Sequence, residues 1–224
     1  MKRITVLLAE DHQVVREGFR SLLQHERDIE VIGEAETGRQ AVQLTRKLRP
    51  AVVVMDIAMP LLNGLEATRQ IRKDFPDTKV LILSAHSDDA YVEQVAVLGA
   101  AGFLLKQTSS HVLATAIREV QKGNSFFSSS VSKRVQDRSR KLAGRGGSKK
   151  SGNRLSSREV EVLQLIAEGK PNKQVASELG LSFKTVDKHR QHLMSKLDIH
   201  DVAGLTRYAI AEGIIESSVR LTIT

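Results

Sequence analysis

The chain contains no cysteine, and this absence excludes both disulfide bonds and thiolate metal sites. Long apolar segments are missing as well, because no run reaches the length of about 18 residues that a transmembrane helix needs. The start of the chain, MKRITVLLAED, lacks the length and the cleavage site of a signal peptide. We therefore expect a cytoplasmic protein that has no membrane among its partners.

The composition favours packed cores over disorder. Hydrophobic residues make up 41% of the 224 positions, and this length suits either two domains or one large domain. Positive charge is unevenly placed: residues 1–124 carry 16 basic and 16 acidic side chains, whereas residues 125–224 carry 18 basic and 10 acidic ones. A neutral half followed by a basic half indicates a controlling module joined to a module that meets a polyanion.

Residues 125–153 have the composition of a linker. Within them, residues 133–150 contain eight basic residues and one acid, together with Gly144, Gly146 and Gly147. Such a segment joins two domains, either as a passive tether or with additional contacts to DNA phosphates. The sequence leaves both alternatives open.

Short apolar runs alternate with amphipathic helical stretches in the first half. Runs of this length, rich in β-branched residues, are typical of strands buried on both faces. Five strand–helix units predict an α/β domain over residues 1–124, with a parallel sheet covered by helices on both sides. The expected strands are Ile4–Leu8, Glu30–Ala35, Val52–Asp56, Val80–Ser84 and Gly102–Leu105.

Chemically reactive side chains stand at the ends of four of these runs. Glu10 and Asp11 follow the first run, Asp56 closes the third, Ser84 closes the fourth and Lys106 follows the fifth. Open α/β sheets bind ligands at the carboxyl ends of their strands, so we expect these side chains to converge. Three acids, a hydroxyl and an amine suit a Mg²⁺ and phosphoryl site. Asp11 and Asp56 are the expected direct metal ligands, and Glu10 is expected to act through water.

Each of these residues has an ordinary alternative role when it is considered alone. The acidic pair can be favoured by a helix dipole, the lysine can be a solvated surface residue and the serine can be a helix cap. The combination at one sheet edge favours the phosphoryl site.

The second half predicts a small all-α domain over residues 154–224. Its first helix begins with a capping box formed by Ser156 and Glu159. A short helix, a turn at Gly180 and a longer helix then form a helix-turn-helix. The expected caps and ends are Asn172 and Leu179 for the short helix, Ser182 and Leu197 for the longer helix, and Asp201 and Gly213 for a final helix.

The longer helix has an outward face that suits DNA. Val186, Leu193 and Leu197 share one side and should pack inward, which leaves lysine and glutamine side chains outside. In the major groove, lysine recognises guanine and glutamine recognises adenine. The structural alternative is a helical bundle with a merely charged face. The side chains expected outside are Lys184, Lys188, Gln191 and His192, with Lys170, Lys173 and Arg190 near phosphates.

Residues 3–122 resemble the receiver domain of bacterial response regulators. The resemblance implies a flavodoxin-like, doubly wound sheet of strand order 2-1-3-4-5. It also implies that a sensor histidine kinase phosphorylates Asp56, that Ser84 then moves toward the phosphoryl group and that Phe103 rotates. Gln107 stands where many receivers have proline, so we do not expect a cis peptide there. The residues that carry the resemblance are Glu10, Asp11, Asp56, Met59, Pro60, Gly64, Ser84 and Lys106.

Residues 155–212 resemble the LuxR-type helix-turn-helix of the NarL/FixJ response regulators. The matching stretches are Leu155–Glu159, Glu161–Leu163, Ile166–Lys170, Asn172–Lys173, Thr185–Val186, His189 and Lys196–Leu197. The resemblance places base contacts at Asp187, Lys188 and Gln191, with Thr185 and His189 also facing DNA. Asp187 departs from the basic residue often found there. Its carboxylate can accept from cytosine N4 or hold a neighbouring lysine, and otherwise it repels phosphate.

Family members commonly dimerise through the last helix, here about Asp201–Glu212, with Val202 and Leu205 in the interface.

The features together predict a two-component transcription regulator. The expected partners are a sensor histidine kinase, double-stranded promoter DNA, a second copy of the phosphorylated chain and RNA polymerase. The expected chemistry is limited to Mg²⁺-assisted self-phosphorylation and slow self-dephosphorylation, so the chain is not expected to be an enzyme.

Two other functions remain as alternatives. One is a dimeric DNA-binding regulator whose receiver domain is structural and independent of phosphorylation. The other is a phosphatase with an aspartyl-phosphate intermediate, similar to the haloacid-dehalogenase-like enzymes. Those enzymes place an Asp-x-Asp pattern after the first strand, where this chain has Glu10 and Asp11, and they need a cap insertion that does not occur before residue 122.

Overall fold

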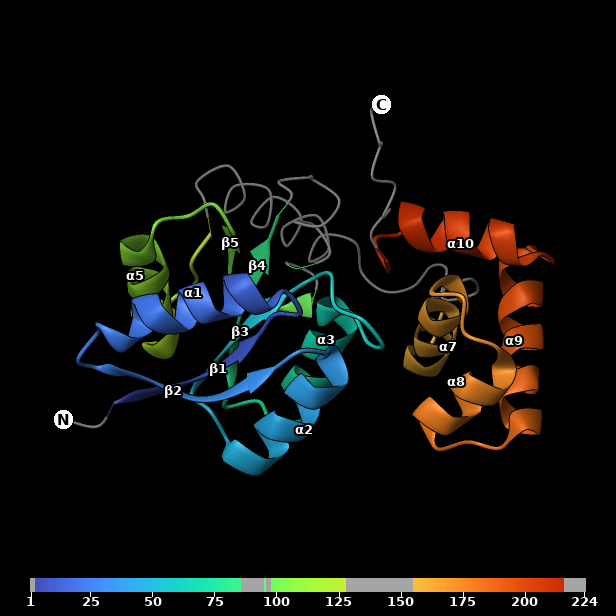
Figure 1. Ribbon diagram of the computed structural model, residues 1–224, viewed down its shortest axis with the longest axis horizontal. Helices are drawn as coiled ribbons and strands as arrows, with labels where there is room; N and C mark the ends of the chain where they lie inside the picture. The colour runs from blue at the N-terminus through green and yellow to red at the C-terminus, as the bar shows by residue number, and fades with distance from the viewer. Residues whose placement is uncertain (1–2, 86–94, 96–97, 128–154, 216–224) are drawn as a thin grey trace, which may run out of the picture. The chain divides into compact units, whose positions relative to one another are not determined.

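The chain forms two units, Met1–Ser148 and Lys149–Thr224, in the computed structural model (Figure 1). The structure describes residues 3–85, 95, 98–127 and 155–215. The division falls within the predicted linker, residues 125–153. Most of that linker lies outside the described residues, as does most of the helix predicted over residues 88–98. Among the described helices, none is long and apolar enough to cross a membrane.

A five-stranded parallel sheet with the order β2-β1-β3-β4-β5 is the centre of the first unit. This order and the parallel pairing confirm the doubly wound topology. The sequence also located the strands well, because the bounds of two agree with the prediction and each of the other three is one residue longer. The strands are β1 Ile4–Ala9, β2 Ile29–Ala35, β3 Val52–Asp56, β4 Lys79–Ser84 and β5 Gly102–Leu105.

Helices cover both faces of this sheet, and each face has its own apolar core. Successive strand residues point to opposite faces, so Leu7 enters one core while Val6 and Leu8 enter the other. Helices α2 and α3 pack on the Leu7 side, and α1 and α5 pack on the Val6 side. The helices are α1 Gln13–Gln24, α2 Gly38–Leu48, α3 Gly64–Asp74 and α5 Ser110–Gln121.

The packing of the first unit continues past residue 124, where the sequence predicted its end. The backbone N–H of Phe126 donates to the Ala101 carbonyl oxygen, and its own carbonyl accepts from the N–H of Phe103, both at 2.9 Å. Gly102 permits this approach, because a Cβ at that position would lie 2.6 Å from the Phe126 carbonyl oxygen. The chain after α5 therefore extends the sheet edge beside β5.

Four helices form the described part of the second unit. The capping box of Ser156 and Glu159 is present, and Gly180 ends α8 with a left-handed φ of 62°. Ser182 and Asp201 cap the next two helices through their side chains, as predicted. The helices are α7 Ser157–Ala167, α8 Asn172–Leu179, α9 Phe183–Leu197 and α10 Val202–Ala211.

Two details of the second unit differ from the prediction. Asn172 is the first residue of α8 rather than its cap, because the extended backbone of Pro171 takes the cap position. The final helix ends at Ala211, two residues before Gly213. The core contains the predicted inward side chains Val186 and Leu193, both fully buried.

Candidate functional site

The register of the parallel sheet brings the reactive side chains to one edge. Between β1 and β3, the pairing places Glu10 level with Asp56. Between β4 and β5, Lys106 follows the residue paired with Ser84, and its backbone N–H donates to the Ser84 carbonyl oxygen at 2.8 Å. Glu10, Asp56 and Ser84 are all nearly inaccessible to solvent. The predicted convergence at the carboxyl ends of the strands is therefore present.

Lys106 supplies the positive charge of this cluster. Its Nζ lies 2.8 Å from Glu10 Oε2 and 3.1 Å from Asp56 Oδ2. Burial lowers the pKa of the Lys106 ammonium, but Asp56 and Glu10 outweigh this effect, so its pKa stays above the ordinary value. Lys106 is thus a permanent cation shared by two buried carboxylates.

Burial of the Asp56 carboxyl group disfavours its ionised form. Burial and the nearby charge of Glu10 raise the pKa of Asp56 to about 7, although Lys106 acts in the opposite direction. Additional positive charge at this site would promote the ionised form, which is the form that can act as a nucleophile.

Three buried carboxylate oxygens fit a divalent cation. Glu10 Oε2, Asp11 Oδ1 and Asp56 Oδ2 accept no hydrogen bond from the residues that the structure describes. Two of these atoms lie within ion-pair distance of Lys106, which compensates their charge only in part. Oxygen donors of this kind are the ligands that Mg²⁺ prefers. Each of the three predicted metal ligands thus has a buried carboxylate oxygen at this end of the sheet.

His12 adjoins the acidic pair and was not identified from the sequence. Its Nδ1 lies 2.8 Å from Asp11 Oδ1 and 3.1 Å from Glu10 Oε1. Asp11 is the main reason why the pKa of His12 lies above its ordinary value. One potential ligand atom from each of these three residues lies within 4.8 Å of the others. The position of the histidine directly after two acids was the only signal in the sequence.

The loop after β3 packs its backbone closely against Asp56. A Cβ on Gly64 would lie 1.8 Å from the Asp56 carbonyl oxygen, so only glycine fits there. The Gly64 N–H donates to the Ile57 carbonyl oxygen at 2.8 Å, and Asn63 caps α3 through its side chain. In the same loop, Leu61 has a left-handed φ of 67°. Glycine at position 64 therefore fixes how the chain leaves the predicted phosphoacceptor.

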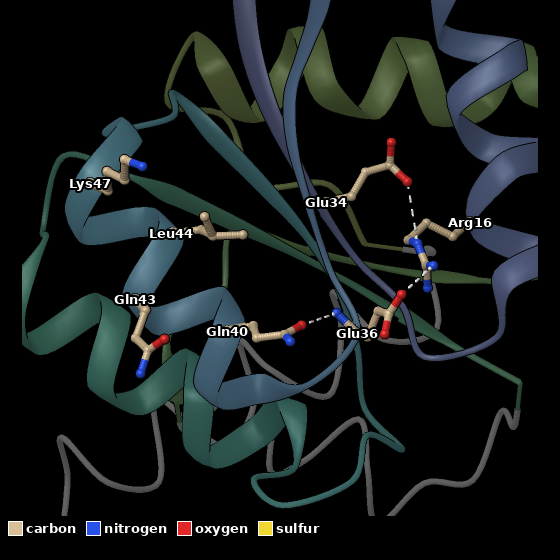
Figure 2. A pocket seen from close by; sticks show the side chains of 7 residues that line it. All are labelled: Arg16, Glu34, Glu36, Gln40, Gln43, Leu44 and Lys47. Atoms are coloured by element: carbon tan, nitrogen blue, oxygen red, sulfur yellow. Dashed lines mark hydrogen bonds and ion pairs between the residues drawn. The ribbon is translucent and has the colours of Figure 1, made fainter.

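A buried arginine, Arg16, connects this site to β2, and Figure 2 shows its contacts with Glu34 and Glu36. Arg16 Nη1 donates to the Glu10 carbonyl oxygen at 2.6 Å. Its Nε donates to Glu34 Oε2 at 3.2 Å, and its Nη2 donates to Glu36 Oε1 at 2.8 Å. Both acids also line a surface pocket beside α2. Only 8% of the Arg16 side chain is exposed. Sequence periodicity on α1 gave no signal for this role, because the contacts depend on how β1 and β2 pair.

The predicted switch residues Ser84 and Phe103 are both buried, with exposed fractions of 3% and 6%. Phe103 packs into the apolar core on the α2 and α3 side of the sheet. The peptide bond between Lys106 and Gln107 is trans, as expected where proline is absent.

Helix α9 presents the face predicted to meet DNA. Its exposed side chains include Lys184, Lys188, Gln191 and His192, and Lys173 is exposed on α8. Thr185, Asp187 and His189 are half-buried. Phe183, the first residue of α9, is 59% exposed, although apolar periodicity gave no indication of this.

Several polar groups on α9 already have partners within the second unit. Gln191 Nε2 donates to Asp187 Oδ2 at 3.0 Å, so Asp187 holds a glutamine and not the lysine considered from the sequence. The Thr185 hydroxyl is hydrogen-bonded to the Ser182 hydroxyl at 2.8 Å. Arg190, predicted to contact phosphate, donates to Asn172 Oδ1 at 3.1 Å. These contacts fix the start of α9 and its junction with α8.

The two side chains predicted for a dimer interface differ in exposure. Val202 is 42% exposed, but Leu205 is fully buried within its own unit and cannot form part of a dimer surface. Ile210 is the other large apolar side chain of α10 that is exposed, at 38%.

The fold and the site together define a class of protein. A parallel sheet of order 2-1-3-4-5, with an acidic pair, an aspartate and a lysine at its strand ends, is the architecture of a receiver domain, and a helix-turn-helix follows it. The chain matches the family described as "Response regulator receiver domain" over residues 6–118. It also matches the family described as "Bacterial regulatory proteins, luxR family" over residues 153–209. The chain belongs to the response regulators that join a receiver domain to a LuxR-type DNA-binding domain, and it is a phosphorylation-controlled DNA-binding transcription regulator.

Full-length relatives share both domains. The chain is 40% identical over 206 residues to the transcriptional regulatory protein LiaR of Bacillus subtilis, covering 92% of this chain and 96% of LiaR. It is 36% identical over 213 residues to the response regulator protein VraR of Staphylococcus aureus, covering 95% and 99% of the two chains.

Solved structures of response regulators resemble the chain as well. RcsB of Salmonella typhimurium matches with a TM-score of 0.55 and 31% identity, covering 94% of this chain and 100% of that one. A structure of RcsB bound to promoter rprA in the presence of phosphomimetic BeF3⁻ matches with a TM-score of 0.57 and 28% identity, covering 92% and 98%.

Proposed function

We propose that Asp56 is the phosphoacceptor and that the donor is the phosphohistidine of a sensor histidine kinase. An oxygen of the ionised Asp56 carboxylate attacks the phosphorus, the P–N bond breaks, and the departing imidazole takes up a proton. The observation that carries this assignment is the buried Asp56 carboxylate at the end of β3, with the Lys106 ammonium 3.1 Å away. A fixed cation at that distance stabilises the charge on the transferred phosphoryl oxygens.

Glu10, Asp11 and Asp56 are the residues that would hold Mg²⁺. When bound, the ion supplies positive charge that lets anionic donor and acceptor oxygens approach each other. Three buried carboxylate oxygens, two of which share the Lys106 ammonium, support this assignment. The chain's own chemistry then consists of self-phosphorylation from small donors and slow self-dephosphorylation.

Phosphorylation replaces the single negative charge of the ionised Asp56 carboxylate with a phosphoryl group that carries a charge of about −1.5 to −2, next to the Lys106 ammonium. We infer that Lys106 pairs with the new phosphoryl oxygens, that Ser84 donates a hydrogen bond to them and that Phe103 rotates as Ser84 moves. This change favours a homodimer, exposure of α9, or both. The exposed Val202 and Ile210 on α10 supply apolar surface for the dimer.

The second unit then binds double-stranded promoter DNA through α9, and contact with RNA polymerase follows at the promoter. Lys184 and Lys188 are exposed on this helix, and Lys173 on α8 suits a phosphate. His189 and His192 are further candidates for contacts with the duplex, whereas the Thr185 hydroxyl is already engaged at the helix cap. The RcsB structure on promoter DNA supports this use of a similar domain.

The decisive experiment is phosphotransfer to the full-length wild type, Asp56→Asn and Asp77→Asn, followed by DNA-binding titrations of each. Asp77 is an exposed acid outside the site, so its variant should incorporate phosphoryl groups as the wild type does. Asp56→Asn should incorporate none and should lose the phosphorylation-dependent gain in DNA affinity. Regulated DNA binding that persists in Asp56→Asn would instead support a regulator that is independent of phosphorylation.

A further inference from the structure

Phe183, Asp187 and Gln191 form a stripe along the start of α9. They are spaced four residues apart, so they share one face of the helix. Phe183 is 59% exposed and Gln191 is exposed as well. The N-terminal residues of a recognition helix are those that meet base edges. The stripe therefore begins in the part of α9 best placed for base contacts and continues to the middle of the helix.

Asp187 fixes the orientation of the Gln191 amide. A carboxylate only accepts hydrogen bonds, so the nitrogen of the amide must face it, as the 3.0 Å contact from Nε2 to Oδ2 requires. This contact uses one of the two amide hydrogens. The second hydrogen and the Oε1 acceptor remain for another partner. A glutamine recognises adenine with this combination, donating to N7 and accepting from the N6 amino group.

Phe183 adds an apolar group to the same stripe. The only group on a base edge that an apolar side chain prefers is the C5-methyl of thymine. An exposed phenyl ring on a surface helix indicates a partner surface, and the exposed Lys184 and Lys188 beside it indicate that this partner is a polyanion.

We propose that the Phe183–Asp187–Gln191 stripe selects A·T base pairs in the operator. Gln191 contacts adenine, Asp187 is a positioning residue that orients the Gln191 amide, and Phe183 packs against a thymine methyl. The negative charge of Asp187 is unfavourable next to phosphate. Its carboxylate, however, determines how the donor and the acceptor of the Gln191 amide are oriented. This inference rests on the proposed binding of promoter DNA by the second unit.

The first test is selection of DNA from a pool of duplexes with a randomised core, using the full-length chain in the presence of beryllofluoride. The wild type should enrich A·T pairs at the positions under α9. Gln191→Ala should lose the adenine preference at one position by about 10-fold, the discrimination typical of one bidentate contact. Gln174→Ala, an exposed glutamine on α8, should leave the base preference unchanged.

The Asp187→Asn variant distinguishes a role of Asp187 in positioning Gln191 from simple repulsion of the DNA phosphates. Removing the charge strengthens binding to every duplex, and an asparagine that both donates and accepts no longer fixes the Gln191 amide. We therefore expect tighter overall binding together with a weaker adenine preference. Tighter binding with an unchanged preference would show that Asp187 acts only by repulsion and would overturn its positioning role.

The role of Phe183 is tested with duplexes that carry deoxyuridine in place of thymidine. Loss of the methyl should weaken wild-type binding by about 4-fold, while Phe183→Ala should be insensitive to the replacement and Phe183→Leu should retain part of the effect. If the wild type binds no duplex at all, the proposed function fails together with this inference. If it binds DNA with a preference that Gln191→Ala and Phe183→Ala leave intact, only the inference fails.

Discussion

Lys106 Nζ lies 3.1 Å from Asp56 Oδ2, so the proposed phosphoacceptor is already paired with a cation before any phosphoryl group arrives. The same nitrogen lies 2.8 Å from Glu10 Oε2. One ammonium therefore balances two buried carboxylates, and a phosphoryl group formed on Asp56 must compete with Glu10 for it. This sharing determines how the site responds to substitution.

Replacement of Lys106 by methionine should destabilise the receiver domain by about 3 kcal/mol at pH 8, because it leaves two buried carboxylates without their cation. The loss should shrink toward pH 5, where protons replace the missing charge. Urea unfolding followed by circular dichroism measures both values. Lys122→Met is the matched control, since Lys122 is 66% exposed and, among the described residues, pairs with Glu119 three residues away. Equal effects of the two substitutions would contradict a buried ion pair.

Asp56 should make the stability of the receiver domain depend on pH. Its pKa is about 7 in the folded protein and ordinarily 3.8, so between these values the folded state holds a proton that the unfolded state has lost. The free energy of unfolding should therefore decrease as pH rises from about 4 to about 7. Asp56→Asn removes this contribution.

The measurement compares urea unfolding of wild type and Asp56→Asn from pH 4 to pH 8 with a chelator present. The stability advantage of Asp56→Asn should grow with pH and level off above pH 7. A difference between the two proteins that stays constant across this range would show that the folded-state pKa of Asp56 is ordinary.

Gly64→Ala should destabilise the receiver domain strongly and slow its phosphorylation. The added Cβ would meet the Asp56 carbonyl oxygen at 1.8 Å, so the loop or the end of β3 must move. We expect a loss of about 3 kcal/mol or more in thermal or urea unfolding. Gly18→Ala is the control, because no atom of the described part of the chain lies within 4 Å of its Cβ position in α1, and the change should stabilise the helix by about 0.5–1 kcal/mol.

Arg16→Met should lower stability by about 2–3 kcal/mol, because the Glu10 carbonyl oxygen and two carboxylates lose a buried donor. It should also weaken phosphorylation, since the backbone of Glu10 is no longer held. Arg20→Met serves for comparison, as Arg20 is 53% exposed and its bond to Glu34 is worth about 0.5 kcal/mol. An Arg16 variant as stable as the Arg20 variant would rule out the connecting role.

The regular part of the fold could be predicted because each face of the sheet left a pattern in the sequence. The run Val52–Asp56 is apolar without interruption since both faces of β3 are buried, and its bounds agree with the structure. The segment around Phe126 could not be predicted in the same way. It lies beside β5 through backbone hydrogen bonds and the small size of Gly102, and backbone contacts leave little trace in hydrophobic periodicity.

The site was predictable where it depends on strand ends and not where it depends on side-chain contacts across elements. Glu10, Asp56 and Lys106 were identified because parallel strands must bring their carboxyl ends together. Arg16 was missed because its partners lie on two strands whose pairing was not known in advance. Leu205 was assigned to a dimer surface by resemblance, but packing within its own domain buries it.

Leu61, in the loop after β3, has a left-handed backbone conformation that is unfavourable for a residue other than glycine. A non-glycine residue in this conformation costs about 1–2 kcal/mol, which neighbouring contacts such as the buried Leu62 must offset. The loop thus keeps an unfavourable backbone conformation within a few residues of Asp56, and packing of its neighbours has to hold that conformation in place.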